Sequence, residues 1–150
     1  MHRRQADFYQ EAHDRPGLLK LALTAEAGPW QQGAALDFLA ALPDDVPALL
    51  GDLVGLSLSR GWALVVRQAI DRIPHDDLVP LLEPLIVERL DSADDDEYRL
   101  LAELLVHVEA WELLGRLVSR ALDTDDPGTR EVAEDFTQSY SPMWLFKPNP

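Results

Sequence analysis

Leucine, valine and isoleucine recur along this chain at helical spacing, and the pattern repeats with a period of 32 residues. Apolar residues that are three and four positions apart lie on one face of an α-helix. The pattern therefore predicts three equivalent helices, one in each successive unit of a repeat. Their apolar positions are Leu49, Leu50, Leu53, Val54 and Leu58, then Leu81, Leu82, Leu85, Ile86 and Leu90, then Leu113, Leu114, Leu117, Val118 and Leu122.

An acidic residue precedes each of these three sets by four positions, at Asp45, Asp77 and Glu109. A carboxylate in the first turn favours a helix, because the free N–H groups there carry a positive partial charge. We therefore expect each of the three helices to begin near its acidic residue.

Further helical segments lie between and around the three sets, and no segment alternates apolar and polar residues as a strand does. The sequence thus predicts an all-α protein, with residues 1–138 as one domain and a proline-rich tail at 139–150. About nine helices are expected, at residues 2–14, 17–27, 30–42, 45–59, 62–73, 76–90, 95–109, 111–122 and 127–138.

The segment at 117–136, LVSRALDTDDPGTREVAEDF, resembles the junction between two HEAT repeats, with an Asp-Pro loop between two helices. The junction at 90–102 is similar but has no proline, and at 59–69 Ser-Arg-Gly-Trp replaces the acidic loop. The resemblance to HEAT and armadillo repeats covers about residues 30–138. It implies an α-solenoid of about four helix pairs in a right-handed superhelix, a class that binds proteins or peptides along an extended face.

The small and polar positions of the three equivalent helices are expected to form one continuous outer ridge. This ridge is a candidate partner-binding surface. Its expected contact residues, together with Gly51, are Asp52, Glu83, Val87, Arg116 and Ser119.

The chain has 150 residues and a formal net charge of −14, from 13 Lys and Arg against 27 Asp and Glu. An acidic surface repels nucleic-acid phosphates and anionic lipids, so neither is an expected partner. The chain has no cysteine, which excludes disulfides, thiolate zinc sites and cysteine nucleophiles. Residues 1–15 are charged where a signal peptide needs an apolar run, and no stretch approaches the about 18 apolar residues of a membrane span. A cytoplasmic protein is expected.

The negative charge is concentrated at 91–135, where fourteen carboxylates face four arginines. Two clusters within this range occupy equivalent junctions of the repeat, so we expect them to share one edge of the molecule, which we call the acidic rim. One interpretation is helix capping and solubility, which a salt-adapted proteome would also produce. The other is a landing surface for a basic protein. The rim lacks the spacing of an EF-hand calcium loop. The clusters are Asp91, Asp94, Asp95, Asp96 and Glu97, and Asp123, Asp125 and Asp126.

Four apolar residues, Met-Trp-Leu-Phe at 143–146, lie in the proline-rich tail. Pro142, Pro148 and Pro150 are expected to exclude a regular helix there. Large apolar side chains favour burial, so the tail either covers the last helix pair as a cap or docks into a neighbouring subunit or partner. Trp144 and Phe146 are the residues expected to make this contact.

No arrangement of residues typical of catalysis is visible. Glu103 and His107, and Asp71 and His75, are spaced four apart as metal ligands on a helix are, but neither pair has a third ligand. We therefore expect no metal and no cofactor.

The predicted function is thus non-enzymatic binding of a basic protein, as the inhibitor or immunity protein of a basic toxin. The alternative is a scaffold or adaptor subunit, with self-association through the tail. DNA glycosylases of HEAT-like architecture are a third, less favoured class. They need a basic groove, whereas this chain is strongly acidic.

Overall fold

The computed structural model describes residues 15–145, and this part of the chain contains eight α-helices, three short 3-10 helices and no strand. The predicted all-α class is thereby confirmed. The expected helix at 2–14 lies outside the described residues. The α-helices are α2 (Arg15–Ala22), α3 (Pro29–Ala41), α4 (Leu50–Leu56), α5 (Ala63–Ile70), α6 (His75–Leu90), α7 (Asp95–His107), α8 (Trp111–Leu122) and α9 (Pro127–Leu145). The 3-10 helices are η1 (Ala25–Ala27), η2 (Pro43–Asp45) and η3 (Pro47–Leu49).

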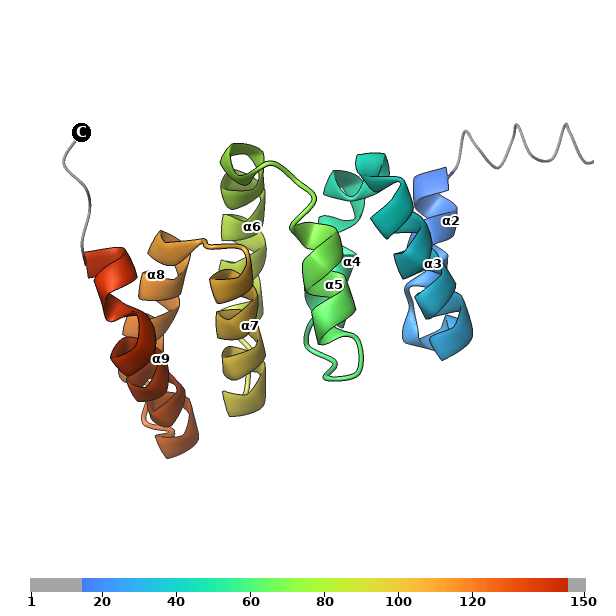
Figure 1. Ribbon diagram of the computed structural model, residues 1–150. Helices are drawn as coiled ribbons and strands as arrows, with labels where there is room; N and C mark the ends of the chain where they lie inside the picture. The colour runs from blue at the N-terminus through green and yellow to red at the C-terminus, as the bar shows by residue number, and fades with distance from the viewer. Residues whose placement is uncertain (1–14, 146–150) are drawn as a thin grey trace, which may run out of the picture.

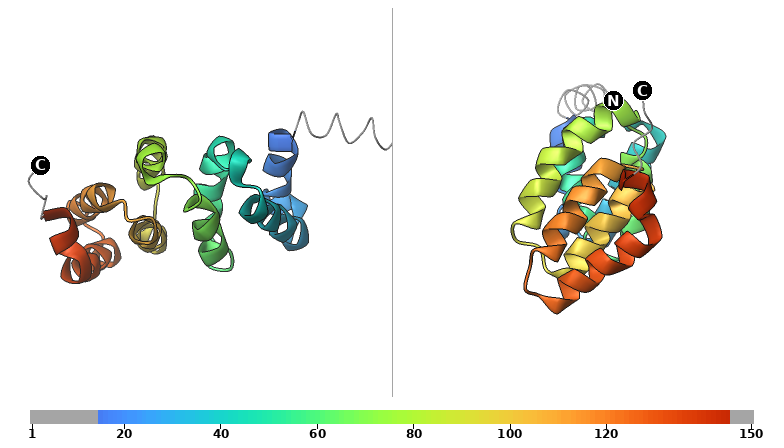
Figure 2. Two further views of the ribbon diagram at one scale, coloured as in Figure 1. Left: turned by 45° about the horizontal axis from the view of Figure 1, so that its top comes forward. Right: turned by 90° about the vertical axis from the view of Figure 1, so that its left-hand side faces the viewer.

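The helices follow one another in chain order along the molecule, so that α2 and α9 lie at opposite ends (Figure 1). In one row, α3 packs on α5, α5 on α7 and α7 on α9. In a second row, α4 packs on α6. Glu83 of α6 and Asp91, the residue that follows α6, form ion pairs with Arg116 and Arg120 of α8. Seen from the C-terminal end, the axes of α6, α7, α8 and α9 are roughly aligned, and the chain reverses direction from each helix to the next (Figure 2). The loops that connect these helices therefore lie side by side along the edges of the two rows.

The 32-residue pattern describes much of the core. Its second positions, Leu50, Leu82 and Leu114, are all buried, and so are the fourth, Val54, Ile86 and Val118. Two leucines depart from the pattern: Leu81 and Leu122 are each 42% exposed. Helix α6 packs chiefly against α4, and its Leu81 side faces solvent. Leu122 is the last residue of α8.

The predicted helix at 45–59 is wrong in extent. Two 3-10 turns, η2 and η3, precede α4, which covers only 50–56. Each of these turns begins with a proline, Pro43 or Pro47, and proline lacks the N–H that an interior helical position donates.

Glu109 does not begin a helix, contrary to the sequence prediction. It has a positive φ of 58° and lies just after α7, while α8 begins at Trp111 with Glu112 in its first turn. The N–H of Ala110 donates to Leu105 O at 2.9 Å, and the N–H of Glu109 donates to Val106 O at 3.1 Å. These two bonds form the Schellman motif that ends a helix, and glycine is the residue that favours its left-handed position.

We therefore predict that Glu109→Gly raises the free energy of unfolding by about 1 kcal/mol, because it removes a side chain that disfavours positive φ and a negative charge from the carbonyl end of α7. Denaturation in urea measures this change. Glu109→Ala keeps the Cβ atom and serves as the control, with a smaller gain. A loss of stability in Glu109→Gly would instead indicate that Glu109 acts as a first-turn carboxylate of α8.

Helix α9 is longer than the sequence predicted, and it includes most of the expected tail. It continues through Pro142 to Leu145, so this proline does not exclude a helix. Pro142 is exposed, and the carbonyl group it leaves without a helical donor, that of Gln138, belongs to an exposed residue as well. The last turn is held by Trp144, whose ring lies against Gly115 of α8.

Candidate partner-binding surface

The α6–α7 and α8–α9 junctions lie side by side and surround one open hollow of about 420 Å³. Residues of both acidic clusters therefore lie around one hollow, although four of the eight rim carboxylates, Asp96, Glu97, Asp123 and Asp125, do not line it. Asp91, Asp94 and Asp95 line the hollow from the first junction, and Asp126 lines it from the second. Tyr98 and Arg120 also line it.

Three carboxylates of the acidic rim begin helices. Asp94 Oδ1 accepts the N–H of Glu97 at 2.8 Å, and the Glu97 side chain accepts the N–H of Asp94 at 3.5 Å, which together form the capping box of α7. Asp126 Oδ2 accepts the N–H of Thr129 at 2.9 Å and its hydroxyl at 2.8 Å at the start of α9. The capping interpretation thus accounts for Asp94, Glu97 and Asp126.

Two further carboxylates of the acidic rim pair with arginines that lie far away in the sequence, one in a helix and one in a loop. Arg120 of α8 donates to Asp91, and Arg60 donates to Asp96 Oδ1 at 3.1 Å. The bond to Asp91 raises the pKa of Arg120 above its usual value. Burial raises the pKa of the neighbouring Tyr98 hydroxyl, an effect that Arg120 opposes. These two carboxylates each have an arginine partner within the protein itself.

Asp95, Asp123 and Asp125 are exposed, and their side chains have neither a hydrogen bond nor an ion pair within residues 15–145. Asp95 lies close to the start of α9, where a Cβ atom added at Gly128 would come within 2.5 Å of its carboxylate oxygen. These three residues carry the part of the rim charge that faces solvent without a partner. They are the rim residues best placed to meet a second protein.

The predicted ridge does not present a continuous free surface. Glu83 and Arg116 form an ion pair with each other, and the bond raises the pKa of Arg116. Asp52 is half-buried in a hollow of about 440 Å³ between α4 and α6. Val87 is exposed on α6, whereas Ser119 lies in another hollow beside Asp123 and Trp144. Phe146 lies outside the described residues.

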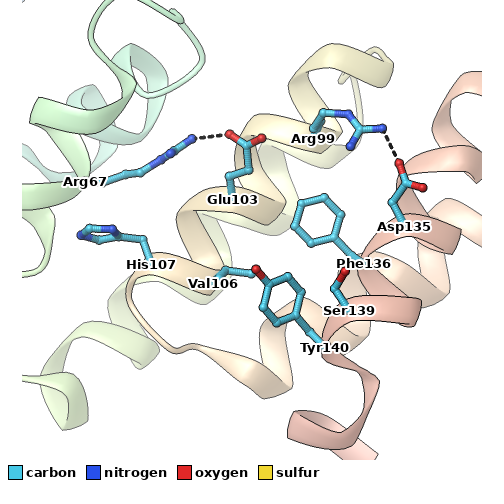
Figure 3. Close-up of a pocket in the computed structure, with 9 residues that line it drawn as sticks. All are labelled: Arg67, Arg99, Glu103, Val106, His107, Asp135, Phe136, Ser139 and Tyr140. Atoms are coloured by element: carbon cyan, nitrogen blue, oxygen red, sulfur yellow. Dashed lines mark hydrogen bonds and ion pairs between the residues drawn. The ribbon is translucent and has the colours of Figure 1, made fainter.

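Another hollow, of about 440 Å³, lies between α5, α7 and α9 and was not predicted from the sequence (Figure 3). Arg67 donates to Glu103 at 2.8 Å on one side, and Arg99 donates to Asp135 at 2.9 Å on the other. Phe136 and Tyr140 supply its apolar wall, and their rings stack with centroids 5.9 Å apart. In both ion pairs the acid follows the arginine by 36 residues, the signal that could have revealed them.

The two ion pairs of Figure 3 tie α5 to α7 and α7 to α9. Their opposite charges balance, so this hollow attracts neither a cation nor an anion strongly. Its arrangement therefore fits a structural connection within the first row of helices better than a charged binding site.

The two residue pairs considered as metal ligands have other contacts. Glu103 accepts a hydrogen bond from Arg67, and His107 Nε2 lies 4.0 Å from Asp71. His75 Nε2 lies 3.2 Å from the backbone oxygen of Glu109. Among residues 15–145 no group of three His, Asp or Glu side chains is placed to hold a metal ion.

Comparison of the chain with protein-family models, with curated proteins and with solved structures finds no match. The HEAT resemblance, the solenoid and its handedness therefore stay predictions from the residues. No helix in the described part of the chain is long and apolar enough to span a bilayer.

Proposed function

We propose that this protein is a non-enzymatic binding module whose acidic rim takes a basic protein partner. The observation that carries the proposal is the meeting of two acidic junctions around one hollow, with Asp95, Asp123 and Asp125 unpaired. Charge is also unequal along the chain: residues 1–75 hold seven basic and nine acidic residues, and residues 76–150 hold six and eighteen. The negative field is thus strongest at the C-terminal half.

Such a field acts mainly on how fast a partner arrives. A concentration of one sign of charge steers an oppositely charged protein toward the surface and raises the association rate more than the final affinity. An inhibitor of a basic toxin or nuclease is the partner relationship that benefits most from fast association. A scaffold subunit is the alternative, and it would bind several partners with weak dependence on salt.

The test is affinity capture from the native cell lysate at about 50 mM and about 500 mM salt. The rim variant carries Asp95→Asn, Asp123→Asn and Asp125→Asn, which removes three charges and breaks no hydrogen bond within residues 15–145. The control variant carries Glu26→Gln, Asp37→Asn and Asp76→Asn, three exposed residues outside the rim.

We expect the wild type and the control variant to retain one basic protein at low salt, and the rim variant to retain at least about tenfold less of it. High salt should weaken capture by the wild type. Equal capture by the rim and control variants would show that overall charge, and not the rim, attracts the partner. Capture of nothing by the wild type would contradict the proposed function.

A further inference from the structure

A second hollow, of about 580 Å³, lies between α8 and the last turn of α9. It brings together residues that the sequence placed in three different groups: Arg116 and Ser119 from the ridge, Asp123 from the acidic rim and Trp144 from the tail. Arg120 lines both this hollow and the rim hollow, so the two adjoin. We call the second hollow the terminal groove.

The apolar side of the terminal groove is the end of α9. Trp144 is half-buried with its ring against Gly115, where an added Cβ atom would come within 2.9 Å of it, so the ring is fixed in place. Leu145, which also lines the groove, is 73% exposed. Met143, two residues earlier in α9, is 48% exposed but does not line the groove. Large apolar side chains left in water favour a site that buries them on binding.

The polar side of the terminal groove carries a net negative charge, because its arginines are paired and Asp123 is not. Arg116 and Arg120 already pair with Glu83 and Asp91. Asp123 is exposed and has no ion pair among the described residues. The groove therefore combines an apolar wall with an unpaired carboxylate at its edge.

We propose that the terminal groove takes an apolar side chain from a basic amphipathic segment of the partner, with a neighbouring lysine or arginine of that segment at Asp123. This inference rests on the proposed function, since it names how the same partner is held once the rim has attracted it. A second copy of this chain fits less well, because residues 76–150 carry eighteen acidic against six basic residues and repel their like.

Two synthetic peptides of equal positive charge test the proposal with the full chain. One is an amphipathic helix of lysine and leucine, and the other has serine in place of each leucine. The groove variant carries Leu145→Ser, and the control variant carries Leu21→Ser, a leucine that is 66% exposed elsewhere on the surface. Isothermal titration gives the affinities, and circular dichroism confirms that both variants are folded.

We expect the wild type and the control variant to bind the lysine–leucine peptide roughly tenfold more tightly than the lysine–serine peptide, and the groove variant to lose this difference. Equal, salt-sensitive binding of both peptides by the wild type would overturn the groove while the proposed function stands. Binding of neither peptide at low salt would count against the proposed function itself.

Two other occupants give distinct results. If sedimentation gives the groove variant a lower mass in solution than the wild type, a second copy occupies the groove and the proposal is wrong. If the lysine–leucine peptide binds only after residues 146–150 are deleted, the groove belongs to this chain's own end, which also overturns it.

Discussion

The Leu82→Ala substitution is expected to lower the free energy of unfolding by about 3 kcal/mol. Leu82 lies on α6 and is completely buried, at 0% exposure, so removal of its side chain loses apolar burial and leaves a cavity. Chemical denaturation monitored by circular dichroism measures the change.

The neighbouring leucine is the control. Leu81 is 42% exposed, and we expect Leu81→Ala to cost less than about 1 kcal/mol. Both residues belong to the 32-residue pattern, so the sequence alone predicts equal burial and equal losses. Equal losses in the two variants would contradict the orientation of α6 in the structure.

The Trp144→Ala substitution is expected to lower the free energy of unfolding by about 2 kcal/mol, less than a fully buried tryptophan, because Trp144 is only half-buried. Its ring packs against Gly115 and fixes the last turn of α9 on α8. Equilibrium denaturation measures this change. A loss of this size would show that the tail acts at least partly as a cap.

Trp30→Ala is the matched control, because Trp30 lies in the first turn of α3 with 86% of its surface exposed. Its loss should be close to zero. If Trp144→Ala leaves stability unchanged but alters the mass in solution, the tail is a docking segment and not a cap.

Periodicity identified the helices well where tertiary contacts agree with it. The predicted helix at 111–122 has the observed bounds of α8, because its strong apolar face packs against both α7 and α9. The errors fall where one residue outweighs the pattern. Pro47 shortens the helix at 45–59, and Glu109 takes a left-handed conformation that only the reversal between α7 and α8 explains.

The extension of α9 past Pro142 shows the opposite error. The helix-breaking tendency of proline predicted that α9 ends before Pro142. The helix continues because Trp144 contacts Gly115, which lies 29 positions earlier in the sequence. Such a contact is a property of the packed structure. No single-segment pattern contains it.

The acidic rim could be found from the sequence because its two clusters recur in phase with the repeat. The partners of its individual carboxylates could not. Arg120 and Arg60 reach Asp91 and Asp96 from helices or loops 29 and 36 residues away, and only the fold decides which carboxylates they pair with. The distinction between paired Asp91 and unpaired Asp95 therefore comes from the structure.

The most direct test of the acidic rim is the association rate constant of the captured partner, measured as salt rises from about 50 to about 500 mM. We predict that the rate for the wild type falls by at least about tenfold, that the rim variant is slower at low salt, and that the two converge at high salt. Identical rates and identical salt dependence for the wild type and the rim variant would contradict the account.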